Sequence, residues 1–224
     1  MTLTSKGHTD TSVPRSTSTG ADNTGAATPL LWMRGQRAAL GPFTRELAEL
    51  YWRWENEPTV IAGMGRQTPE SLEARLAGYD AQARSMGTIP RFTIYDLTRG
   101  GVPVPVGTSA LRIDHYVRTA EFIILLGEDG RGRSLATEAT RLTLDYAFTI
   151  SALRSVWLKV LAPNTGAIAA YDKAGFRHAG RLRRAGYWNG TEADELIMDV
   201  VADEYLAPPD PDPANCTALS AAPQ

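Results

Sequence analysis

The sequence has a single cysteine, Cys216, and no long hydrophobic run. One cysteine excludes an intramolecular disulfide and a zinc site built from cysteines, which fits a reducing compartment. No segment approaches the roughly 20 apolar residues that span a bilayer. Residues 1–29 also lack the continuous apolar stretch of a secretory signal. We therefore expect a cytoplasmic protein without a membrane partner.

The charged residues nearly balance, with 23 basic and 25 acidic side chains and a formal net charge of −2 at pH 7. A chain with this charge has no general electrostatic attraction for DNA, RNA or an anionic membrane surface. We therefore expect no nucleic-acid partner. Any anion that the protein binds must be held by a local group of hydrogen-bond donors.

Large apolar side chains are scarce at both ends of the chain. Residues 1–29 are mostly small and polar, and residues 207–224 are rich in Pro and Ala. Such segments bury too little apolar surface to offset the entropy lost on ordering, so we expect two disordered tails. Either tail could instead be an interaction segment. Residues 30–206 are long enough for one sizeable core, and we expect one folded domain there.

Two amphipathic helices are predicted in the first half of this domain. Thr44 is suited to cap the first helix, which should end before Pro58, and Thr68 followed by Pro69 should open the second. In both segments apolar residues recur at helical spacing. These residues are Leu47, Leu50, Tyr51 and Trp54 in the first helix, and Leu72, Leu76, Tyr79 and Ala83 in the second.

The rest of the domain alternates between strand and helix patterns. The predicted strands are 92–97, 106–113, 119–126, 155–161, 176–182 and 196–201, and the predicted helices are 135–148 and 165–174. A helix between the strands at 119–126 and 155–161 implies a right-handed parallel crossover, whereas the other strand pairs are expected to be antiparallel. The patterns therefore predict a mixed α/β sheet with helices on both sides.

The segment LLGEDGRGRSLATEA, residues 125–139, joins a predicted strand to a predicted helix through glycines and arginines. Residues 127–134 match the phosphate loop of nucleotide triphosphatases, Gly-x-x-x-x-Gly-Lys-(Ser/Thr), at all but one position: Arg133 stands where that loop has its lysine. Arginine is bulkier and planar, so the two are not interchangeable at such a site. Antiparallel elements also precede the motif, which disfavours the nucleotide interpretation.

A second interpretation of this loop relies on backbone amides. Where a strand turns into a helix, several unpaired N–H groups point at one spot, and the helix dipole adds partial positive charge there. Arg131 and Arg133 add full charges beside it. This combination suits a diphosphate and requires no metal ion. The plainer alternative is a turn made by Gly130 and Gly132, with solvated arginines.

The segment VLAPNTGAIAAYDKAGF, residues 160–176, resembles the second signature of the GNAT superfamily of acyl-CoA N-acyltransferases, and the loop resembles the first. The first signature, (Gln/Arg)-x-x-Gly-x-(Gly/Ala), aligns with residues 131–136. Ser134 takes its first Gly position, where a Cβ could crowd the approach of phosphate to the backbone. Residues 180–198 resemble the closing hairpin of the branch that includes ribosomal-protein N-terminal and polyamine acetyltransferases. We identify the chain as ribosomal-protein N-terminal acetyltransferase-like.

The resemblance implies a fold and a cosubstrate. The fold is a mostly antiparallel mixed sheet with one splayed parallel strand pair and helices on both faces, and the cosubstrate is acetyl-CoA. In this fold pantetheine binds between the splayed strands, much as an added strand would. By resemblance, the residues that contact CoA are Ile124, Leu125, Leu126, Arg131, Gly132, Arg133, Ser134, Leu135, Ala136, Thr137 and Asn164. Asn164 also stands where a helix N-cap is expected.

The resemblance also implies catalytic residues. Tyr171 matches the position whose phenol, with a pKa of about 10, protonates the departing CoA sulfur in many members. On spacing alone it would be a packing residue of an amphipathic helix. Glu121 lies on the strand before the loop among apolar neighbours, where burial suits a general base, although it could face solvent or an arginine. His115 and His178 are further candidates for the base, though both are expected at the surface.

Glu55, Glu57 and Trp54 lie at the end of the first predicted helix, where the resemblance places the acceptor pocket. The carboxylates could bind a cationic substrate or could be solvated, and a tryptophan at helical spacing is more often a core residue. No cysteine lies near the expected site. This argues against an acyl-cysteine route and favours direct attack in a ternary complex.

We therefore expect an N-acetyltransferase that moves an acetyl group from acetyl-CoA to the primary amine of a small molecule, such as an antibiotic, an amino sugar or a polyamine. Two alternatives stay open: a protein or peptide N-terminus as the acceptor, and a non-catalytic module that binds acyl-CoA. No metal is expected. The protein could be a monomer or a homodimer.

Overall fold

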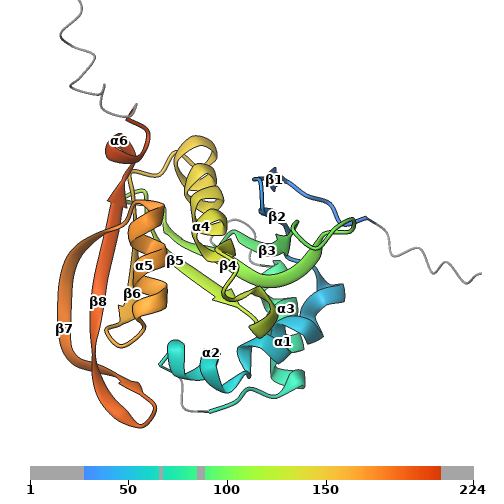
Figure 1. Ribbon diagram of the computed structural model, residues 1–224, viewed down its shortest axis with the longest axis horizontal. Coiled ribbons are helices and arrows are strands. Elements are labelled where there is room, and N and C mark those ends of the chain that lie inside the picture. The colour runs from blue at the N-terminus through green and yellow to red at the C-terminus, as the bar shows by residue number, and fades with distance from the viewer. Residues whose placement is uncertain (1–27, 66–67, 85–88, 208–224) are drawn as a thin grey trace, which may run out of the picture.

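The computed structural model describes residues 28–65, 68–84 and 89–207 (Figure 1). Cys216 and nearly all of the two expected tails lie outside the described residues. In the described part, no helix is long and apolar enough to cross a membrane.

One eight-stranded sheet runs through the domain in the order β1-β2-β3-β4-β5-β6-β8-β7 (Figure 1). Its strands are β1 (Met33–Arg34), β2 (Ala38–Pro42), β3 (Arg91–Asp96), β4 (Val104–Asp114), β5 (Thr119–Leu126), β6 (Ser155–Leu161), β7 (Arg177–Trp188) and β8 (Thr191–Val201). Neighbouring strands are antiparallel except β5 and β6, which are parallel. The predicted mixed and mostly antiparallel sheet is confirmed.

The parallel pair separates soon after it forms. β5 and β6 share only the pairs Thr119–Ser155, Ala120–Val156 and Glu121–Trp157. Beyond Glu121, β5 stays paired with β4 as far as Leu126, and β6 stays paired with β8 as far as Leu161. The two facing strand edges are therefore unpaired past Glu121, which confirms the expected splay.

Helices cover both faces of the sheet (Figure 1). α4 (Leu135–Asp145) and α5 (Thr165–Ala174) lie on one face, and α1 (Ala48–Glu55), α2 (Pro58–Gly63) and α3 (Leu72–Arg84) lie on the other. A short α6 (Ala202–Tyr205) ends the described chain. Two apolar clusters fill the α4 and α5 side, and a third, with Tyr51, Trp54, Val60 and Leu125, lies under α1 and α2.

Several predicted boundaries were wrong for local reasons. α3 begins at Leu72, because Ser71 Oγ accepts the amide of Ala74 at 3.2 Å, so Thr68 and Pro69 do not open it. α4 ends at Asp145 and continues as a π-helical turn, Tyr146–Ile150. Among the described strands and α-helices, two strands and two helices were not predicted: β1, β2, α2 and α6. Ala83, assigned to the inner face of α3, has a side chain outside the described residues.

Glu138 of α4 holds β1 and β2 against the helix that follows the loop. Its carboxylate accepts the backbone amides of Gln36, Arg37 and Ala38 at 2.6, 2.9 and 3.1 Å. A Cβ on Gly35 would lie 2.3 Å from Glu138 Oε1, so only glycine fits there without a shift. The first turn of α4 is thereby fixed to the sheet edge.

Candidate active site

The loop after β5 ends in a group of free backbone amides. Gly132 and Ser134 have positive φ angles of 70° and 60°, and α4 starts immediately afterwards at Leu135. Within the described residues, no protein acceptor takes the N–H groups of residues 134–137. These are the orphan donors of a helix N-terminus, where the dipole favours an anion. The backbone geometry is therefore compatible with the predicted anion site, which stays a prediction.

Arg131 secures the loop to α2. Its guanidinium donates to Thr59 Oγ1 at 2.5 Å, to Glu57 Oε2 at 2.6 Å and to the Leu126 carbonyl at 3.1 Å. Glu57 also accepts the amide of Glu128 at 3.2 Å. Glu57 and Arg131 bind each other and shape the loop; their expected contacts with the acceptor and with CoA, respectively, stay predictions.

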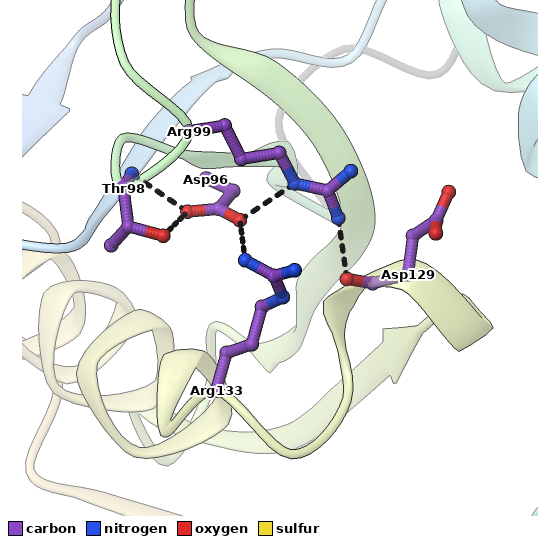
Figure 2. A network of polar contacts seen from close by, with 5 residues as sticks. All are labelled: Asp96, Thr98, Arg99, Asp129 and Arg133. Atoms are coloured by element: carbon purple, nitrogen blue, oxygen red, sulfur yellow. Dashed lines mark hydrogen bonds and ion pairs between the residues drawn. The ribbon is translucent and has the colours of Figure 1, made fainter.

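Asp96 at the end of β3 is the centre of a polar network that reaches the loop (Figure 2). Its carboxylate is 0% exposed and accepts from Thr98 N and Oγ1 at 2.8 and 2.7 Å and from Arg99 Nε at 3.0 Å. Arg133 Nη1 lies 3.6 Å away. Arg99 also donates to the Asp129 carbonyl at 2.6 Å. Asp96 therefore orients both an arginine and the backbone of the loop.

The pKa of Asp96 is set by two opposing effects. Burial alone would raise this pKa, but the hydrogen bonds from Thr98 and Arg99 and the charge of Arg133 outweigh burial and lower it. The carboxylate is thus charged at neutral pH. Sequence reasoning missed Asp96, although an Asp two residues before a Thr is a common local turn signal.

Trp54 packs against the backbone of the loop that follows β5. It is 6% exposed and packs with Leu125 and the other residues of the α1 and α2 cluster. A Cβ on Gly127 would lie 2.3 Å from the Trp54 ring, so the ring lies directly against the loop backbone. Trp54 is placed as a buried support of the loop, and its predicted contact with an acceptor stays a prediction.

Tyr171 lies on the inner face of α5, beside the splayed strands. Its side chain is 9% exposed and packs edge-on against Phe122 of β5 and against Phe176, with ring centroids 6.3 and 6.0 Å away. Burial raises the pKa of the Tyr171 phenol to about 12. Within the described residues its hydroxyl has no hydrogen-bond partner, so the proton is free to be donated to a ligand.

Asn164 caps α5, since its Oδ1 accepts the amide of Ala167 at 3.3 Å. Its other side-chain atom, Nδ2, faces the end of α2, because a Cβ on Gly63 would lie 3.6 Å from it. Asn164 therefore stands where α5, α2 and the end of β6 come together. The cap is compatible with the pantetheine contact, which stays a prediction.

Glu121 is the last residue of β5 that pairs with β6, and it forms an ion pair with Arg112 of β4. Its neighbours Ala120 and Phe122 belong to the core under α4 and α5, so its side chain projects to the opposite face. The sequence left open whether Glu121 is a buried base or instead faces solvent or an arginine, and the structure shows the arginine contact. His115 and His178 are both exposed, and His115 lies at the end of β5 away from the loop.

Glu55, the remaining predicted acceptor residue, forms a buried ion pair with Arg75 of α3 at 3.0 Å. It is therefore part of the packing between α1 and α3. In the described part of the chain, no group of three or more His, Cys, Asp or Glu side chains could hold a metal ion.

Comparison with known proteins identifies the family. The family described as acetyltransferase (GNAT) domain matches residues 37–177. The chain belongs to this family, which confirms the resemblance at the level of the superfamily.

Two curated relatives are spermidine N(1)-acetyltransferases. The protein of Escherichia coli (strain K12) is 36% identical over 97 residues, which cover 43% of this chain and 52% of the relative. The protein of Vibrio cholerae is 28% identical over 116 residues, 52% of this chain and 65% of the relative. The matched region thus spans between half and two thirds of these relatives.

The fold also resembles a solved structure. The crystal structure of spermidine N-acetyltransferase from Vibrio cholerae in complex with CoA and spermine has a TM-score of 0.71 and 24% identity, covering 77% of this chain and 100% of that one. The likeness confirms the expected fold.

The left-handed backbone at Ser134 generates a first prediction. A non-glycine residue at this φ stores about 1 kcal/mol or more of strain, so Ser134→Gly should stabilise the protein by about 1 kcal/mol and raise Tm by a few degrees. Ser134→Ala keeps the Cβ and should behave like the parent chain. Gly132→Ala should destabilise the protein. A Cβ at residue 132 would meet no other atom within 4 Å, but the positive φ would strain the backbone of any residue other than glycine. Thermal unfolding of the three variants measures this, and equal Tm values for the Gly and Ala variants at 134 would contradict it.

Asp96→Asn should loosen the loop. Losing a buried charge with several hydrogen bonds should cost about 2 kcal/mol of folding stability at pH 7 and weaken CoA binding several-fold. Because folding lowers the pKa of Asp96, its contribution is complete above about pH 5 and is lost progressively as the pH falls through about 4 towards the lowered pKa. The difference in the free energy of unfolding between the parent chain and the variant should therefore decrease at acidic pH. Urea unfolding from pH 3 to 7 tests this, with exposed Asp203→Asn as the control; a gap independent of pH would contradict it.

Proposed function

We propose that this protein is an N-acetyltransferase that moves an acetyl group from acetyl-CoA to a primary amine of a small molecule. The observation that supports it most is the placement of the free amides of residues 134–137 at the end of a strand whose parallel neighbour has separated from it. A diphosphate fits the amides and the dipole of α4. The unpaired edges of β5 and β6 offer backbone partners to an extended amide chain such as pantetheine.

When bound, acetyl-CoA supplies the acetyl carbon to which the amine nitrogen bonds as the carbon–sulfur bond breaks. Tyr171 then donates its phenolic proton to the departing sulfur. The raised pKa of the phenol keeps that proton in place at every physiological pH. The guanidinium of Arg133, which Asp96 orients, adds positive charge beside the amides that hold the diphosphate.

The amine must lose a proton as it attacks. Glu121 lies where β5 and β6 diverge, on the face away from α4, and is the carboxylate we assign to this step, directly or through a water molecule. Its partner Arg112 fixes the orientation of the carboxylate and leaves one oxygen for a proton. No covalent intermediate with the enzyme is required.

The acceptor class rests on the curated relatives. Their names specify spermidine, which makes a polyamine one candidate among small amines. The narrower ribosomal-protein N-terminal acetyltransferase-like branch, with a peptide N-terminus as the acceptor, and the non-catalytic acyl-CoA-binding module remain alternatives. Cytoplasmic location, a metal-free reaction and a monomeric or homodimeric state also stay predictions.

Tyr171→Phe tests this proposal. The variant keeps the ring packing against Phe122 and Phe176 but lacks the proton, so kcat for amine acetylation should fall about a hundredfold while the Kd for acetyl-CoA changes little. Thiol release with a panel of amines measures the rate, and isothermal titration measures binding. Because burial raises the pKa of Tyr171 to about 12, the parent rate should show no loss of an acid group below about pH 10.

The control for Tyr171→Phe is Tyr187→Phe, which removes the same group from an exposed tyrosine of β7. It should leave kcat unchanged. Binding of acetyl-CoA without turnover of any amine would support the non-catalytic module instead. Full activity of Tyr171→Phe would exclude Tyr171 as the acid.

A further inference from the structure

Three arginines and two glutamates lie on the side of the sheet that α1 and α3 cover. Arg75 pairs with Glu55 at 3.0 Å, and Arg112 pairs with Glu121. The third arginine, Arg91 of β3, has no carboxylate at ion-pair distance within the described residues, although it interacts electrostatically with Arg75, Arg112 and Glu55. The cluster therefore carries an excess of one positive charge.

Two buried donors in this cluster have no hydrogen-bond partner among the described residues. They are the Nε atoms of Arg75 and Arg91, which are shielded from solvent. The Arg75 side chain is only 8% exposed. The two guanidinium groups lie 5.5 and 6.0 Å from the centre of the Phe43 ring. Buried donors without acceptors are costly and rare in native structures, so each requires an explanation.

Burial lowers the pKa of Arg91, and the charges of Arg75 and Arg112 lower it further, against the opposing charge of Glu55. The positive charge of Arg91 is thus opposed by its surroundings, and a bound anion would relieve this cost. Arg91 is also reachable, because it forms part of the wall of a pocket of about 390 Å³ with Phe43 and Tyr79.

The cluster is close to the place assigned to amine attack. Arg91 pairs with Ala110, which pairs with Ile123 on the diverging part of β5, and Arg112 pairs with Glu121. All five charged side chains lie on the face of the sheet that α1 and α3 cover. Two strand spacings separate β3 from β5, so Arg91 is roughly 10 Å from β5 at the backbone.

We propose that the acceptor carries a carboxylate, held by Arg91 and its neighbour Arg75, several ångströms from the amine that is acetylated at Glu121. Guanidinium groups bind carboxylates in a planar, paired geometry, and Arg91, which lines the pocket, has no carboxylate partner among the described residues. A polyamine would instead place a second ammonium beside the excess positive charge, which repels it. This inference rests on the proposed acetyltransferase function and narrows its acceptor to amines with an acid group.

Matched pairs of acceptors test the inference. Lysine and cadaverine differ only in a carboxylate, as do ornithine and putrescine, and in both acids a long chain separates the terminal amine from the carboxylate. With saturating acetyl-CoA, kcat/KM should be at least about tenfold higher for the acid in at least one pair. In that pair, Arg91→Gln should lower kcat/KM for the acid about ten- to a hundredfold. The same substitution should leave kcat/KM for the diamine unchanged or raise it.

Arg53→Gln is the matched control, since it removes the same charge from an exposed residue of α1 and should change neither member of a pair. Acetyl-CoA titration of each variant verifies that the folded site is retained. The inference would be overturned if both diamines had kcat/KM values equal to or higher than those of their acids. It would also be overturned if Arg91→Gln lowered kcat/KM equally for both members of each pair. Either result would leave the acetyltransferase function intact. Binding of acetyl-CoA with no turnover of any amine would overturn both.

Discussion

The separation of β5 and β6 after three residue pairs is the constraint on which the site depends. A parallel pair that stayed hydrogen-bonded to its end would leave no unpaired backbone for a ligand. Each strand remains anchored on its outer side, β5 to β4 and β6 to β8, so the unpaired edges stay rigid without each other. Tyr171 and Glu121 both lie beside this opening, on opposite faces of the sheet. Under the proposed function, the divergence therefore determines where thioester and amine can meet.

The loop at the end of β5 is held from three sides, which explains how it keeps its amides free. Arg131 binds Glu57 on α2, Trp54 lies beneath Gly127, and Asp96 reaches Arg133 and, through Arg99, the backbone at Asp129. Free donors at a helix N-terminus are favourable only when an anion or water meets them. Buttressing by side chains fixes their direction before any ligand arrives, which lowers the entropy lost on binding.

Sequence patterns predicted much of this fold because its main strands and α4 and α5 are long and periodic. They missed β1, with two residues, and α2, with six, because such short segments carry little periodicity. The glycines and arginines located the loop and indicated an anion site on its backbone amides, and the resemblance identified the expected anion as the diphosphate of CoA. The partners of Arg131 and Arg133 could not be predicted, since Glu57 and Asp96 lie far away in sequence and meet them only through the sheet. The same limit applies to the cluster around Arg91, whose members come from five different elements.

The proposed site has two positively charged regions: the loop before α4, with the free amides of residues 134–137 and Arg133, and the group of arginines around Arg91 on the face that α1 and α3 cover. The central claim of the proposed function is that CoA binds between β5 and β6 with its diphosphate on the amides of residues 134–137. The most direct test is an amide NMR titration of the labelled protein with CoA and, separately, with pantetheine, which lacks the diphosphate. The account predicts that CoA produces its largest shifts at residues 134–137 and that pantetheine leaves them nearly unchanged. Binding of CoA that leaves these amides unperturbed, or no binding, would contradict it.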